Sequence, residues 1–64
     1  MEKTLIKVAS RTLAERAKCS LSEATKIVEL FCEYYKFCSP FWFEWNGVSV
    51  WDVWEETLKR YGIE

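Results

Sequence analysis

The sequence predicts a mainly α-helical protein of three or four helices, with a short β-hairpin or tight loop between Phe41 and Val48. Two observations predict this class. Apolar residues recur at the three- and four-residue spacing of a helix in three segments of the chain. The residues that break helices are confined to Pro40, Gly47 and Gly62, beyond or between those segments. Because the chain has no repeat and no linker composition, residues 1–64 are expected to form a single helical domain.

The first predicted helix covers residues 3–17, a segment without Gly or Pro. Its apolar residues recur at helical spacing, and they are Leu5, Ile6, Ala9, Leu13 and Ala17. Thr12 followed by Glu15 also has the pattern of a capping box, in which side chains at a helix start bond its free N–H groups. The segment is therefore either one helix or two short helices joined near residues 10–12.

A second helix is expected to begin at Ser20, because this side chain can cap the first N–H groups while Glu23 reaches back to the cap. Pro40 keeps the residue before it out of the helical conformation, so this helix should end near Phe37 or Cys38. On a helical wheel its apolar residues cover about 220° and its polar residues about 100°. A face this wide needs contacts from two sides, supplied by the other helices, by a second copy of the chain, or by both.

The dipeptide Asn46-Gly47 favours the positive φ angles of a type I′ hairpin turn, and the aromatic residues before it favour strands. A third helix is then expected to start at Ser49, with Asp52 in its first turn, and to stop at Gly62.

The third helix has two faces. Its apolar stripe consists of Val50, Val53, Trp54, Leu58 and Tyr61. On the opposite side, two pairs have the i,i+4 spacing of helix ion pairs, Glu55 with Lys59 and Glu56 with Arg60.

Several features typical of enzyme sites are missing from the sequence. The chain has no His, which is the usual general base near neutral pH, and its two Gly cannot form a phosphate-binding loop. The spacing of Cys19, Cys32 and Cys38 fits neither a disulfide framework nor a zinc site, so we interpret them as small half-buried apolar side chains. The sequence therefore predicts a non-enzymatic binding protein without a metal or a cofactor.

Charged and aromatic residues are unevenly distributed. Residues 1–30 carry a net charge of +2 and residues 31–64 a net charge of −3, and every aromatic residue lies between Phe31 and Tyr61. No apolar run approaches the roughly 18 residues of a membrane span, and the N-terminus has no signal-peptide core. The odd number of Cys favours a reducing compartment. We therefore expect an intracellular, cytoplasmic protein that does not enter a membrane.

The segment Thr12–Val28 carries small and apolar residues in a particular order around a predicted tight turn: Leu13, Ala14, Ala17, Cys19, Ala24 and Ile27. This order resembles the helix-turn-helix of bacterial and phage repressors. Small residues let two short helices cross closely and leave the first turns of the second helix free for the major groove of DNA. Lys18 stands where this pattern usually has Gly.

The resemblance implies a regulator that binds duplex DNA through a helix-turn-helix-like corner. The residues facing the groove would be Ser20, Ser22, Glu23, Thr25 and Lys26. Phosphate contacts would come from Arg11, Arg16 and Lys18, with Lys3 and Lys7 adding to the positive field. The Asn46-Gly47 hairpin would take the place of a wing. The alternative is a plain helix-loop-helix corner of a bundle, whose cations form a solvated stripe.

A second resemblance covers Leu13–Ala24, which is similar to the opening two helices of the histone-like bacterial nucleoid proteins. In that family these helices serve dimerisation, and long basic β-arms hold the DNA. The present chain carries no such arms, so this resemblance implies dimerisation.

The aromatic residues suggest a protein-binding surface, because Trp and Tyr are enriched at interface hot spots and their number exceeds what a core of this size needs. The candidate residues for self-association or partner binding are Tyr34, Tyr35, Phe37, Trp42, Trp45 and Trp51. Acidic residues around them would suit a basic partner. The alternative is a dense core that compensates for small size. Two hypotheses follow: a dimeric helix-turn-helix regulator, or a protein-interaction module that acts as an adaptor or inhibitor of a larger complex without a nucleic-acid role.

Overall fold

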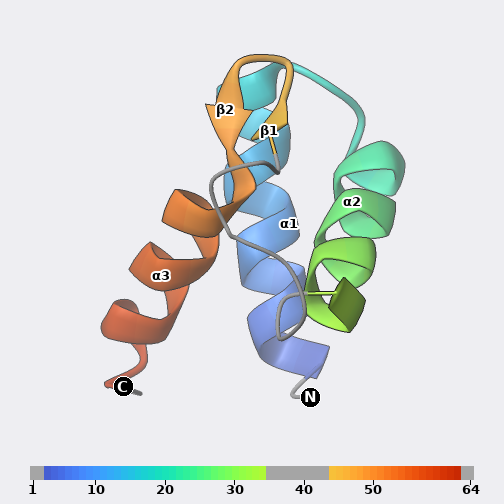
Figure 1. Ribbon diagram of the computed structural model, residues 1–64. Coiled ribbons are helices and arrows are strands. Elements are labelled where there is room, and N and C mark those ends of the chain that lie inside the picture. The colour runs from blue at the N-terminus through green and yellow to red at the C-terminus, as the bar shows by residue number, and fades with distance from the viewer. Residues whose placement is uncertain (1–2, 35–43, 63–64) are drawn as a thin grey trace.

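Helix α1 (Lys3–Ala17) is the central element of the structure, a computed structural model that describes residues 3–34 and 44–62 (Figure 1). Helix α2 (Leu21–Tyr34) packs along one side of α1, and helix α3 (Val50–Arg60) packs along another. Within the described residues, the structure confirms the predicted small, mainly α-helical fold.

Of the two predicted alternatives, the structure shows one continuous helix, α1, rather than two short helices. Ser10 and Thr12, at the position of the alternative joint, donate their hydroxyls to the carbonyls of the preceding turn, with Ser10 Oγ to Ile6 O at 2.6 Å and Thr12 Oγ1 to Val8 O at 3.1 Å. A hydroxyl bonded to the carbonyl four residues earlier is compatible with an uninterrupted helix. Thr12 therefore does not act as a cap.

The predicted start of the second helix is confirmed. The Glu23 N–H donates to Ser20 Oγ at 3.1 Å, and the Ser20 hydroxyl donates to Glu23 Oε1 at 3.3 Å. These two bonds satisfy a free N–H at the start of α2 and hold the Glu23 side chain over the cap. The predicted end near Phe37 or Cys38 lies outside the described residues.

The hairpin consists of β1 (Glu44–Trp45) and β2 (Val48–Ser49), which pair antiparallel with Trp45 opposite Val48. Asn46 and Gly47 connect the strands with φ angles of +51° and +78°, as a type I′ turn requires. The structure therefore confirms the hairpin between Phe41 and Val48 over its described part, and residues 41–43 lie outside that part. The hairpin sits beside the end of α1 that leads into α2 (Figure 1).

Helix α3 starts and stops as expected. The Asp52 N–H donates to Ser49 Oγ at 3.3 Å, which caps the start of the helix. Gly62, with φ of +71°, donates its N–H to Lys59 O at 3.0 Å and ends it.

Only one of the two predicted ion pairs on α3 forms. Arg60 Nη2 lies 3.2 Å from Glu56 Oε2, whereas no ion pair joins Glu55 and Lys59 in the described part of the chain. The prediction for Glu55 and Lys59 was therefore wrong. Exposed pairs at this spacing gain only about 0.3–0.5 kcal/mol, which is too little to fix two long side chains together.

The core is built by all three helices. Its buried apolar side chains are Leu5, Ala9, Leu13, Ala17, Ala24, Val28, Phe31, Val50, Val53 and Trp54. Phe31 of α2 faces two rings of α3, with ring centroids 6.1 Å from Trp51 and 6.4 Å from Trp54. Two buried hydroxyls are bonded within their own helices, Ser10 as described above and Thr57 to Val53 O at 2.8 Å. The core of the described residues therefore contains no side-chain polar atom without a partner.

Within residues 3–34 and 44–62, no helix combines the length and the apolar composition needed to cross a bilayer.

Candidate nucleic-acid interface

The turn between α1 and α2 is closed by backbone geometry that the sequence pattern did not make obvious. Lys18 adopts a φ of +55°, the left-handed conformation that Gly favours at the end of a helix. The Cys19 N–H then donates to Ala14 O at 3.2 Å, which satisfies a carbonyl of the last turn of α1. Lys18 thus takes the conformation of the Gly that this position usually carries, and its side chain is exposed.

Small side chains line the contact between α1 and α2. Ala17 and Ala24 are buried on either side of the turn, and Ala14 is half-buried and packs against the core. Small side chains at such a contact let two helix backbones approach closely. Leu13 of α1 and Val28 of α2 belong to the same buried core and are 0% and 1% exposed.

The outer side of α2 presents several residues predicted to face a DNA groove. Ser20, Ser22 and Lys26 are exposed, and Thr25 is half-buried with its hydroxyl committed to Leu21 O at 2.8 Å. The exposed Glu23 belongs to the cap described above. Lys18, Ser22 and Lys26 therefore offer the side chains on this corner that can meet a phosphate or a base edge directly.

The hairpin is fastened to the turn by two side chains. Asn46 Nδ2 donates to Ala17 O at 3.2 Å, and Trp45 Nε1 donates to Cys19 Sγ at 3.3 Å. The first bond satisfies the last carbonyl of α1, and the second covers the half-buried thiol. These contacts place the hairpin beside the end of α1 and the turn that leads into α2, although its residues include the acidic Glu44 and no cation.

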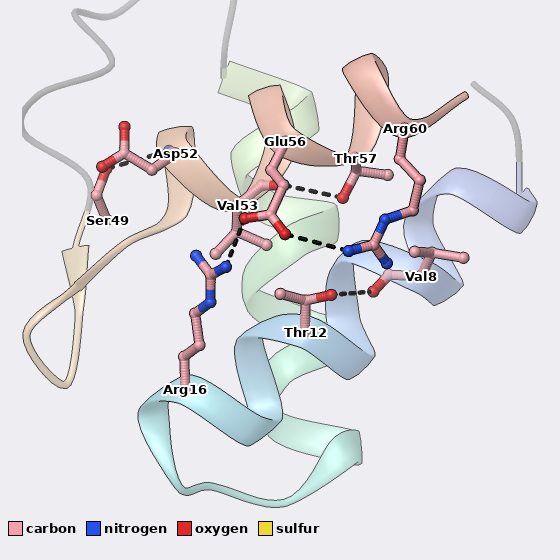
Figure 2. A network of polar contacts seen from close by, with 9 residues as sticks. All are labelled: Val8, Thr12, Arg16, Ser49, Asp52, Val53, Glu56, Thr57 and Arg60. Carbon is pink, nitrogen blue, oxygen red and sulfur yellow. Dashed lines mark hydrogen bonds and ion pairs between the residues drawn. The ribbon is translucent and has the colours of Figure 1, made fainter. Parts of the chain in front are cut away.

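Two predicted phosphate contacts lie on another side of the molecule. Arg16 pairs with Glu56 of α3, whose carboxylate also accepts from Arg60 (Figure 2). Arg11 lines a hollow with Arg60 and Tyr61 at the end of α3. The structure thus separates Arg11 and Arg16, which face α3, from Lys18 and the exposed residues of α2.

The described aromatic candidates divide between core and surface. Trp45 and Trp51 are half-buried and pack against the core, whereas Tyr34 at the end of α2 is 44% exposed. The other candidates, Tyr35, Phe37 and Trp42, lie outside the described residues. Much of the described aromatic surface therefore stabilises the fold.

Sequence reasoning did not single out Leu30, which is 42% exposed, or Leu21, which is 51% exposed. Both belong to the wide apolar arc of α2, and the width of that arc was the signal that could have marked them. Leu30 and Tyr34, four residues apart, share one flank of the helix.

The described residues contain no cluster of three or more Cys, Asp or Glu that could hold a metal ion. Burial raises the pKa of the Cys32 thiol, and the nearby Glu29 carboxylate acts in the same direction. A raised pKa lowers the thiolate fraction near neutral pH, and a thiol needs the thiolate form to act as a nucleophile.

Comparison with models of protein families, with curated proteins and with solved structures found no match to this chain.

Proposed function

We propose that this protein is a small DNA-binding regulator of the helix-turn-helix type. The observation that carries the proposal is the closed turn at Lys18, whose positive φ lets α2 leave α1 within three residues. A turn this short fixes the second helix relative to the first, as reading a groove requires. The exposed Ser22 and Lys26 on α2 supply a base-reading hydroxyl and a phosphate-binding ammonium.

The docked hairpin supports the same proposal. The bonds from Asn46 to Ala17 and from Trp45 to Cys19 hold the hairpin against the end of α1 and the turn that precedes α2. A rigid element at this place can follow the DNA backbone next to the groove that α2 enters. Because the hairpin lacks cations, Lys18 and Lys26 carry the electrostatic part of binding.

The test is a titration of fluorescent duplex DNA at several salt concentrations. The logarithm of the binding constant should fall linearly with the logarithm of the salt concentration, with a slope of about −0.9 per neutralised phosphate. Lys18→Ala and Lys26→Ala should each make the slope shallower by about 0.9. Lys59→Ala, which removes another exposed cation from α3, is the matched control and should leave the slope unchanged. Absence of binding at low salt, or equal effects of all three variants, would overturn the proposal.

A second candidate function is self-association through α2. Leu30 and Tyr34 remain 42% and 44% exposed on one flank of this helix, although large apolar side chains are usually buried. A second copy of the chain could cover this flank with its own Leu30 and Tyr34, as the isologous contact of a two-fold dimer requires. This arrangement is compatible with DNA binding, because dimers of helix-turn-helix proteins bind two half-sites.

Sedimentation equilibrium distinguishes this second candidate. Leu30→Glu should shift the protein from dimer to monomer without unfolding it, because the residue is exposed within one chain. Leu21→Glu is the matched control, since it makes the same change at an exposed apolar position in the first turn of α2. A wild-type protein that remains monomeric at high concentration would exclude self-association. A dimer equally weakened by both variants would exclude this flank as the interface.

A further inference from the structure

We propose that the hollow between α1 and the end of α3 binds a small phosphate monoester. The hollow has a volume of about 260 Å³ and is lined by Val8, Arg11, Thr12, Glu15, Arg60 and Tyr61. Two of these lining residues, Val8 and Thr12, are half-buried, and the Thr12 hydroxyl is already bonded to Val8 O at 3.1 Å. The lining groups that remain available to a ligand are exposed side chains, two of them guanidinium groups contributed by different helices.

The same two helices already hold an oxyanion nearby. The Glu56 carboxylate accepts from Arg16 of α1 through one oxygen and from Arg60 of α3 through the other (Figure 2). This arrangement shows that guanidinium groups of α1 and α3 can converge on one anionic group. The planar donor fork of Arg matches both carboxylate and phosphate oxygens.

Arg60 of α3 also lines the hollow, together with Arg11 of α1. Figure 2 shows the Arg60 side chain reaching from α3 toward Val8 and Thr12 of α1, with its guanidinium beside Glu56. The bond from Arg60 to Glu56 uses Nη2, and an Arg carries five N–H donors in total. Arg11 makes no hydrogen bond or ion pair with any residue in the described part of the chain. The two guanidinium groups can therefore both donate to a ligand in the hollow.

Size and charge select the ligand. The hollow is smaller than the roughly 300–1,000 Å³ of typical pockets for drug-sized molecules, so it suits a single anionic group with a small substituent. Among the described lining residues, Arg11 and Arg60 outweigh the carboxylate of Glu15, which gives this part of the lining a net positive charge. A phosphate monoester carries about −1.5 to −2 charges at neutral pH and gains more from two guanidinium groups than a monovalent carboxylate does. The exposed ring of Tyr61 can contact the substituent.

The test is a nuclear magnetic resonance titration that follows the Arg side-chain N–H signals and the Tyr61 amide at constant ionic strength. Sodium phosphate and glycerol phosphate should each produce saturable shifts at Arg11, Arg60 and Tyr61, and sodium chloride should not. Arg11→Gln should weaken binding about tenfold, which corresponds to the 1.4 kcal/mol of one charge-assisted hydrogen bond. Lys59→Gln, an equal loss of charge elsewhere on α3, should change affinity less than twofold.

Glu15→Gln gives a prediction of opposite sign. Glu15 is the one carboxylate among the described residues that line the hollow, and its removal should tighten phosphate binding several-fold, because the repulsion between two anions is lost. Arg11 and Glu15 are exposed, so neither variant should unfold the protein. Shifts that do not saturate, or an Arg11→Gln variant that binds like Lys59→Gln, would overturn the proposal. Shifts at these residues with duplex DNA but with neither small phosphate would also overturn it, because the site would then contact a nucleic-acid backbone.

Discussion

Asn46 joins the hairpin to the helical corner, and its substitution tests whether that docking exists in solution. The residue has two separate roles. Its backbone adopts a φ of +51°, and its side-chain Nδ2 donates to Ala17 O at 3.2 Å. Three substitutions separate these roles. The free-energy cost of the left-handed conformation depends on the Cβ and on the side chain it carries, whereas the hydrogen bond depends on the amide group.

The expected losses of unfolding free energy follow from these two roles. Asn46→Gly keeps the left-handed conformation but removes the hydrogen bond, and should cost about 1 kcal/mol. Asn46→Ala removes the same bond and also forces a Cβ into the left-handed region, so it should cost about 2–3 kcal/mol. Asn46→Asp tolerates the conformation but places a carboxylate against the Ala17 carbonyl, where both groups are acceptors. Its loss should lie between the other two.

Unfolding in guanidinium chloride, followed by Trp fluorescence, measures these differences. In a domain of this size, 1 kcal/mol corresponds to a shift of about 4–8 °C in Tm, which thermal unfolding resolves easily. The slope of free energy against denaturant should stay constant across the series, because the surface exposed on unfolding does not change. If Asn46→Ala is as stable as Asn46→Gly, the left-handed turn is refuted. If Asn46→Asp is as stable as the wild type, the bond to Ala17 is refuted.

Four further predictions follow from the described geometry. Lys18→Gly should raise the unfolding free energy by about 0.5–1 kcal/mol in urea titrations, because Gly adopts a φ of +55° without a Cβ clash; a destabilised variant would contradict this conformation. Leu13→Ala should lower it by about 2–5 kcal/mol, since Leu13 is 0% exposed, and a loss below 1 kcal/mol would place Leu13 outside the core. In a variant with Ser at Cys19 and Cys38, iodoacetamide should alkylate Cys32 at pH 8 more slowly in the folded than in the unfolded protein, because its pKa is raised. For the same reason stability should fall as the pH rises through the pKa of the unfolded thiol, which loses its proton first; equal alkylation rates would show that Cys32 is not desolvated.

Local signals account for the parts of the fold that the sequence predicted. Ser20 and Ser49 cap the helices that follow them, and Gly62 ends α3, because each signal acts on backbone groups within four residues of itself. The ion pair of Glu56 with Arg60 belongs to the same class, since helical geometry brings residues four apart together.

Contacts between distant segments of the chain could not be predicted from such local signals. Arg16 meets Glu56 across 40 positions, and Trp45 reaches Cys19 across 26. Their partners depend on how the helices and the hairpin pack, and several other acidic side chains and the other Cys were equally suitable on sequence grounds. The prediction that Arg16 contacts phosphate used its charge alone, whereas the structure shows that a neighbouring helix already neutralises part of it.

The central place of α1 sets an order for folding. Three residues separate α1 from α2, so these helices can pair by closing a very short loop, whereas α3 must return to α1 across residues 18–49. The entropy lost on closing a loop grows with its length, so docking of α3 should be the slower step. Substitutions in the interface of α3, such as Val53→Ala, should then change the refolding rate. Substitutions at Ala24 should act mainly on the stability of the pair that α1 and α2 form first. Because α1 contacts both other helices, the core is complete only when α3 has docked on α1.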